Sequence, residues 1–141
     1  MHENLNESTG ETKTLIEYLN AILPLDENEK GIVQELFVSR RAKRRQFIHH
    51  EGDVCDYANF VIQGCLKMFM VDEEGKEHNL QFAIENHWIG DLGSFHSGEP
   101  SKLYVEALEN SLILQISKKN LFRLYDEFPK FNKIFRIMKE K

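Results

Sequence analysis

Residue types that bind phosphate are gathered in one short run of the chain, IGDLGSFHSGEPSKLYVEA, over residues 89–107. The run contains three glycines, Gly90, Gly93 and Gly98. It also carries the carboxylate of Asp91 and, further on, the hydroxyl of Ser101 beside the ammonium group of Lys102. Backbone N–H groups in glycine turns can donate to phosphate oxygens, and a nearby cation offsets the phosphate charge. The run therefore predicts a loop that binds an anionic ligand, unless its glycines only form turns.

A second group of chemically active residues is the histidine pair His49 and His50, followed by Glu51. Metal sites of cupin-type enzymes resemble H-x-H with a glutamate a few residues later, and they hold iron or manganese. Adjacent residues of a strand point to opposite faces, so His49 and His50 cannot bind one ion together. No spacing of the later histidines, His78, His87 and His96, requires a metal. We predict no metal site and keep a cupin-like metalloenzyme as the less favoured alternative.

Five basic residues fall within the six positions from Arg40 to Arg45. A run of this kind can contact DNA or RNA, or it can be a solvated strand or loop with its charges exposed. The net charge of the chain is −5, and no aromatic residue is interleaved with the basic ones. Both observations favour the exposed strand or loop.

The rest of the chain offers little catalytic chemistry. No nucleophile has a partner base that the sequence identifies, and nothing fixes Asp91 and Glu99 as a carboxylate pair. The two cysteines, Cys55 and Cys65, are too few for a disulfide framework and fit no zinc motif, so we expect buried or half-buried thiols. No apolar run is long enough to cross a bilayer, and the polar N-terminus does not resemble a signal peptide. We expect a non-enzymatic protein of the cytoplasm.

Helices are expected at the N-terminal end of the chain. Residues 1–12 are polar and are expected to be flexible. Apolar residues then recur at helical spacing, at Leu15, Ile16, Leu19, Ile22 and Leu23. Pro24 ends this predicted helix. Asp26 and Glu29 have the spacing of a capping box, which predicts that a second helix begins here.

Short strands separated by turns are expected in the middle of the chain. The predicted strands cover residues 59–64, 66–71, 78–84, 103–108 and 112–117. Residues 51–53 and 72–76 are predicted turns, each with a glycine suited to positive φ. Many short strands at close spacing are typical of a sandwich or barrel.

Helix returns near the C-terminus, with Ser117 as a predicted N-cap and Pro129 as a break. The final segment carries an apolar stripe formed by Phe131, Ile134, Phe135 and Met138. The stripe has two interpretations, either packing back onto the barrel or contact with a partner chain. The predicted fold is mainly β with helical ends, an α+β arrangement of one domain over residues 13–128 and a further helix over residues 129–141.

The order of these elements resembles the effector domain of the cyclic-AMP receptor and fumarate–nitrate regulator (CRP/FNR) superfamily. Residues 47–82, FIHHEGDVCDYANFVIQGCLKMFMVDEEGKEHNLQF, are similar to the first half of that domain, and residues 88–125 are similar to its second half. The resemblance implies a double-stranded β-helix, or jelly roll, and homodimerisation through the C-terminal helix. In that family a helix-turn-helix domain follows and reads DNA. These 141 residues contain no counterpart of it, so DNA contact is expected only through a domain absent from this chain.

The same resemblance assigns roles within residues 89–107. In members that bind nucleotides, glycine-turn N–H groups hold the cyclic phosphate, a glutamate accepts from the ribose and an arginine neutralises the phosphate. Gly90 and Gly93 match the glycines, Leu92 matches an apolar support, and Asp91 falls on the glutamate. Ser101 falls on the arginine, and Lys102 beside it cannot form the two-pronged contact of a guanidinium.

The sequence therefore predicts the effector-sensing domain of a CRP/FNR-type regulator that does not bind cyclic AMP in the usual way. A genuine cyclic-nucleotide-binding module remains the alternative, with Lys102 as the cation. The predicted effector-binding residues are Gly90, Asp91, Leu92, Gly93, Ser101 and Lys102.

Overall fold

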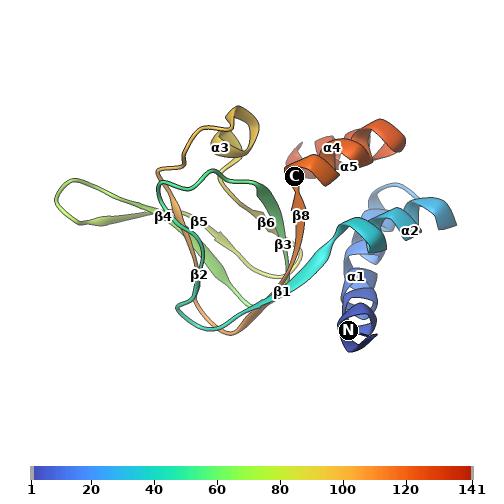
Figure 1. The fold of residues 1–141 in the computed structure, drawn as a ribbon, viewed down its shortest axis with the longest axis horizontal. Helices are drawn as coiled ribbons and strands as arrows, with labels where there is room; N and C mark the ends of the chain where they lie inside the picture. Colours follow the sequence, from blue (N-terminus) through green and yellow to red (C-terminus); the bar gives the residue numbers. More distant parts are fainter. Residues whose placement is uncertain (1, 141) are drawn as a thin grey trace.

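The computed structural model describes the backbone of residues 2–140 and the side chains of residues 10–137. In this part of the chain, eight strands form two four-stranded sheets that face each other, paired antiparallel throughout (Figure 1). Sheet A has the order β1 (Val38–Ala42), β8 (Ser111–Ser117), β3 (Tyr57–Gln63) and β6 (Trp88–Ile89). Sheet B has the order β2 (Phe47–His49), β7 (Tyr104–Ala107), β4 (Leu66–Val71) and β5 (Glu77–Ala83). The predicted jelly roll is confirmed.

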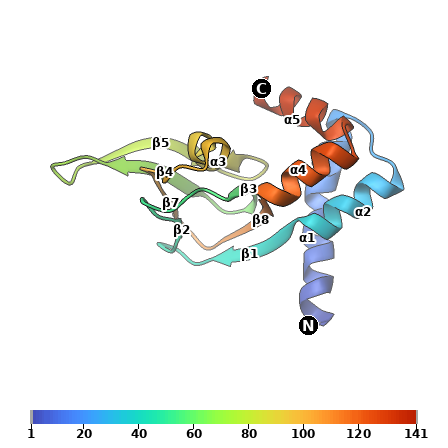
Figure 2. The same ribbon diagram turned by 45° about the horizontal axis from the view of Figure 1, so that its top comes forward.

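The helices are α1 (His2–Ile22), α2 (Glu27–Leu36), α3 (Leu92–Ser97), α4 (Lys118–Glu127) and α5 (Lys130–Glu140). All but α3 gather at one end of the jelly roll, opposite the β4–β5 hairpin (Figures 1 and 2). The five predicted strands are present to within two residues at each end. Helix α1 begins at His2, inside the segment 1–12 that we expected to be flexible, and the side chains of residues 1–9 lie outside the described residues.

The predicted helix caps are confirmed. The Asp26 carboxylate accepts from the Glu29 N–H, and the Glu29 carboxylate accepts from the Asp26 N–H, each at 2.8 Å. The Ser117 hydroxyl accepts from the Asn120 N–H at 3.2 Å and begins α4. Capping groups of this kind satisfy backbone donors that have no partner within the helix, so a few local residues determine where each helix begins.

Two apolar clusters hold the domain together, one on each face of sheet A. Alternate residues of a strand point to opposite faces, so neighbouring residues of β3 and β8 enter different clusters. Val61 and Ile113 face sheet B and are fully buried between the sheets. Phe60 and Leu114 face the helices and are equally buried beneath α1, α4 and α5. The helices are therefore part of the core of the domain.

Helix α5 packs on the rest of its own chain through part of the stripe predicted for dimerisation. Phe131 and Ile134 are fully buried, whereas Phe135 is half-buried. The side chain of Met138 lies outside the described residues. Phe135 also packs against the ring of Trp88, so packing back onto the domain is observed for three of the four residues, and the dimerisation role of the stripe stays a prediction.

Candidate functional site

Residues 90–103 connect β6 to β7 and contain the short helix α3. Asp91 is the N-cap of α3, and its Oδ1 accepts from the Ser94 N–H at 3.2 Å. Gly98 ends α3 in the left-handed conformation with φ of 77°, and its N–H donates to the Ser94 carbonyl at 2.8 Å. A residue with a side chain rarely adopts this φ, so one of the three glycines has a purely conformational role.

The central contact of this loop joins Asp91 to Ser101. The Ser101 hydroxyl donates to Asp91 Oδ2 at 2.7 Å and accepts from the Leu103 N–H at 3.0 Å. Ser101 is buried, with 3% of its surface exposed. A serine hydroxyl has a single proton to donate, and here that proton is committed to Asp91. Ser101 therefore adds no positive charge to the loop and has no second proton for a ligand.

The main chain of Ser101 fixes the loop to the turn after β2. The Ser101 N–H donates to the Asp53 carbonyl, and the Gly52 N–H donates to the Ser101 carbonyl, each at 2.8 Å. Gly52 has φ of 94°, which confirms the predicted glycine turn at residues 51–53. Turn and loop thus hold each other in place, although they are far apart in the sequence.

The other predicted effector residues surround this contact unevenly. Gly93 lies beside it, since a Cβ added there would be 3.4 Å from Asp91 Oδ1. Gly90 packs against the main chain of Tyr57. Leu92 is 55% exposed, and Lys102 is exposed without a carboxylate partner among the described side chains. The structure joins Asp91 to Ser101 and leaves Lys102 outside the contact.

The sequence pattern assigned no role to Ser94, which lies in the loop, or to Cys55, which contacts Ser94 from a distant segment. The buried Ser94 hydroxyl donates to the Glu99 carbonyl at 2.6 Å and accepts from the Cys55 N–H at 2.9 Å. Burial raises the pKa of the Cys55 thiol, and desolvation likewise raises that of Cys65. Cys55 is buried and Cys65 half-buried, as predicted. No spacing signal could have linked Cys55 to Ser94, because the contact depends on how two distant segments pack.

His49 is a further residue of this region that the sequence did not place. Its Nε2 is enclosed and has no hydrogen-bond partner among the described residues. Burial lowers the pKa of His49, and the charges of Asp53 and Asp91 oppose that change. His49 therefore lies within electrostatic reach of the loop carboxylate.

The remaining candidates from the sequence are the basic run, the later histidines and a possible metal site. The basic run over residues 40–45 covers the end of β1 and the turn after it, and the Arg41 guanidinium lies 3.7 Å from the Glu11 carboxylate. Its exposure fits both interpretations of the run, so the choice between them stays a prediction. Among later histidines, His78 lies 2.8 Å from Asp72. Within the described residues, no three His, Cys, Asp or Glu side chains are grouped so as to hold a metal ion. No helix in that part of the chain has the length and apolar character needed to span a bilayer.

Comparison with solved structures supports the fold. A cyclic nucleotide-binding domain from Methylobacillus flagellatus superposes with a TM-score of 0.76 at 18% identity, covering 92% of this chain and 74% of that one. The sensor domain of the transcriptional regulator DNR from Pseudomonas aeruginosa superposes with a TM-score of 0.75 at 16% identity, covering 94% and 88%. At these identities the likeness concerns the fold alone.

Comparison of sequences identifies the family to which this chain belongs. The cAMP-activated global transcriptional regulator CRP of Salmonella typhimurium is 29% identical over 80 residues, which cover 57% of this chain and 38% of the relative. The matched region thus spans well under half of that regulator. The cyclic nucleotide-binding domain family matches residues 39–128, more than half of the chain and including the whole Asp91–Ser101 loop. The resemblance inferred from the order of turn, hairpin and glycine loop is therefore correct, and this chain belongs to the cyclic nucleotide-binding domain family.

Proposed function

We propose that this chain is the effector-sensing domain of a CRP/FNR-type transcription regulator of the cytoplasm. In this proposal the protein has no enzymatic activity and acts as a homodimer through α5. A helix-turn-helix domain outside these 141 residues contacts DNA. The proposed effector site comprises Gly90, Asp91, Leu92, Gly93, Ser101 and Lys102. Family membership and the match to a cAMP-activated regulator support the proposal.

The observation that carries it is a contact between α5 and β6, the strand that leads into the glycine loop. Trp88 lies in β6, and its ring centroid is 5.5 Å from that of Phe135 in an edge-on contact. Asp91 follows Trp88 by three residues, so a ligand that shifts the loop would disturb the surface on which α5 packs. A ligand acts in this way only if it binds the two arrangements of α5 with different affinity.

The proposed effector is not a conventional cyclic nucleotide. A cyclic phosphate carries a negative charge, and a buried anion needs a paired cation. The buried hydroxyl of Ser101 occupies the position where the family resemblance places an arginine, and its proton already serves Asp91. A cyclic nucleotide bound with Lys102 as the cation is the second candidate, because Lys102 is the next residue and has no partner among the described carboxylates.

Thermal melts test this proposal directly. The protein is melted alone and with 1 mM cyclic AMP or cyclic GMP, beside a double variant that combines Asp91→Glu and Ser101→Arg. The wild type should show no shift, whereas the double variant should melt several degrees higher with cyclic AMP. A ligand at about 100 times its Kd contributes about 2.7 kcal/mol to the free energy of unfolding.

A matched control combines Asp91→Glu with Ser101→Gln, which adds a long polar side chain without charge and should not respond. A shift in the wild type would favour Lys102 as the cation and contradict the unconventional effector. No shift in the double variant would show that the loop is not an effector site of the family type. Sedimentation equilibrium tests the homodimer, which should have twice the 16.6 kDa mass of the chain.

A further inference from the structure

A cavity of about 490 Å³ lies between sheet A and the helices, on the side of β6 that faces α4 and α5. Its size falls within the range of about 300–1,000 Å³ typical of small-molecule sites. Large apolar or aromatic residues form much of its lining, among them Tyr18, Trp88, Phe95, Leu121, Tyr125 and Phe135. They come from α1, β6, α3, α4 and α5, so the cavity exists only because the helices pack on the sheet.

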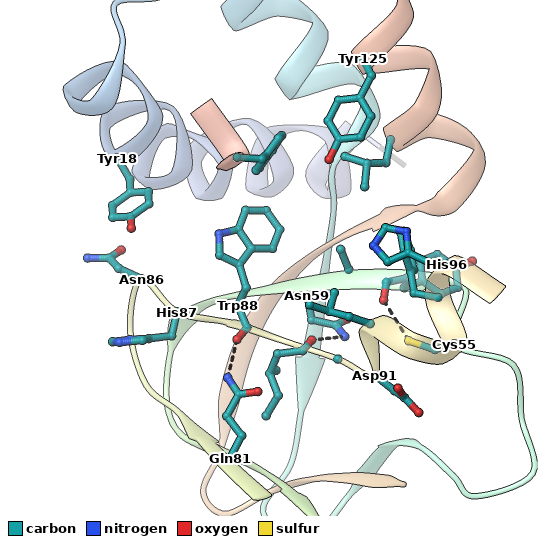
Figure 3. Close-up of a pocket in the computed structure, with 18 residues that line it drawn as sticks. Tyr18, Cys55, Asn59, Gln81, Asn86, His87, Trp88, Asp91, His96 and Tyr125 are labelled. Carbon is teal, nitrogen blue, oxygen red and sulfur yellow. Dashed lines mark hydrogen bonds between the residues drawn. The ribbon is translucent and has the colours of Figure 1, made fainter. Parts of the chain in front are cut away.

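Aromatic rings give the cavity its shape. Trp88 points from the sheet toward the helices, and Tyr125 points toward the sheet from the opposite side (Figure 3). The ring of Phe135 lies 5.5 Å from that of Trp88 and 5.9 Å from that of Tyr125, both edge-on. Flat apolar ligands pack well against rings at such angles.

One polar atom of a residue that lines the cavity has no hydrogen-bond partner. The indole Nε1 of Trp88 is buried and has no acceptor among the described residues. An indole N–H can only donate, and a buried donor without an acceptor is unfavourable. Because Nε1 itself is enclosed by protein atoms, a ligand in the cavity would contact the ring of Trp88 and not its N–H.

The charge of the lining indicates what kind of molecule fits. Among the described residues, no lysine or arginine lines the cavity, and its basic side chains are those of His87 and His96. Asp91 borders it, but its carboxylate points away from Trp88 and accepts from Ser94 and Ser101 (Figure 3). An anion would therefore find no lysine or arginine here, and a cation no free carboxylate.

We propose that this cavity binds an uncharged, largely aromatic small molecule that packs against the rings of Trp88, Tyr125 and Phe135. Such a molecule would touch α1, α4 and α5 together and hold them in one arrangement. This site differs from the Asp91–Ser101 contact, and its occupancy does not depend on whether that loop binds an effector.

Nile red, an uncharged fused-ring dye with one carbonyl acceptor, is a suitable probe because its emission rises in apolar surroundings. The wild type should bind it saturably, with one dye per chain. Ala58 lines the cavity, so Ala58→Phe should fill it and weaken dye binding at least tenfold. Ala21→Phe adds the same ring at an exposed position of α1 and should bind like the wild type. Ala58→Leu, a milder change, should weaken binding severalfold if Ala58→Phe does not fold.

Trp88→Phe tests the packing of the ligand on the indole, because it replaces the large ring by a smaller one. It should weaken binding severalfold. Equal binding by this variant would overturn the proposed packing on Trp88. Three outcomes would overturn the site. The folded Ala58 variants could bind the dye as well as the wild type, or the wild type could give no saturable signal. The dye signal could also rise and fall with self-association measured by sedimentation. Dye binding is measured without a nucleotide and the nucleotide melts are measured without the dye, so the two proposals can fail separately.

Discussion

The Ser101 hydroxyl donates to Asp91 Oδ2 at 2.7 Å and thereby joins the start of the glycine loop to its end. In the nucleotide-binding members that the sequence resembles, an arginine stands at the position of Ser101 and neutralises a phosphate. In this chain the side chains of Asp91 and Ser101 form a hydrogen bond with each other. The loop can therefore keep its conformation without a ligand, which separates its structural role from any sensory one.

The first prediction concerns this bond. Ser101→Ala should lower the free energy of unfolding by about 1–2 kcal/mol, because Asp91 loses a donor and the Leu103 N–H loses an acceptor in a buried setting. Ser97→Ala is the control, since Ser97 is exposed and only accepts from the Glu99 N–H. Urea denaturation compares the two. Equal effects would mean that the Asp91–Ser101 bond does not stabilise the loop.

The second prediction concerns two glycines with positive φ. Gly64 has φ of 111°, and a Cβ there would lie 2.8 Å from Ser111 Cα. Gly64→Ala should destabilise the fold by about 3 kcal/mol or more, from backbone strain and steric overlap together. Gly52 has φ of 94° but open space around its Cα, so Gly52→Ala should cost about 1 kcal/mol. If the two variants have equal urea midpoints, Ser111 can move away from the side chain added at position 64.

The third prediction concerns the attachment of α5 to α2. Lys130 Nζ lies 2.7 Å from Glu29 Oε1 and donates to the Pro24 carbonyl at 3.0 Å. The Glu29 side chain is only 7% exposed, so Lys130→Met would leave a carboxylate buried without its cation. Because Lys130 itself is about one-third exposed, we expect a loss of about 1–2 kcal/mol.

Lys30→Met is the matched control for that change. Lys30 has similar exposure, and its partner Glu27 is 93% exposed at 3.5 Å, so its loss should cost about 0.5 kcal/mol or less. Differential scanning calorimetry compares the melting temperatures of the Lys130→Met and Lys30→Met variants. Equal melting temperatures would show that the Lys130 contact does not anchor α5.

The fourth prediction is a dependence of stability on pH that originates at His49. Burial lowers the pKa of His49 in the folded state, while the unfolded state keeps about 6.5. The neutral ring therefore stabilises the fold fully above about pH 6.5, and this contribution is lost as the pH falls through the lower folded pKa. The urea midpoint of the wild type should fall between pH 7.5 and pH 5.

The variant His49→Gln should lose less stability over the same interval, because glutamine does not titrate. His87 is exposed, so His87→Gln should follow the wild type. Parallel curves for all three proteins would mean that His49 does not control the response to pH.

The features that the sequence predicted correctly are local ones. The capping box of Asp26 and Glu29 spans three residues, and the turn at Gly75 needs only its own positive φ of 83°. The alternation of side chains between the two faces of a strand is also a short-range pattern. In β3 and β8, one face is buried between the sheets and the other is buried beneath the helices. In contrast, β6 is only two residues long, too short for a periodic pattern, and α3 is a single short helix within a glycine-rich run.

By itself, the sequence determined which residues enter the candidate loop, because Gly90, Asp91 and Ser101 share one continuous segment whose order is that of a known family. Only the tertiary structure decided how they are used. The Ser101 hydroxyl turns toward Asp91 because its main chain is bonded to the distant turn at Gly52 and Asp53. Likewise, the contact of Trp88 with Phe135 arises only when α5 packs on sheet A. Neither contact has a sequence spacing that predicts it, since both depend on long-range packing of separate elements.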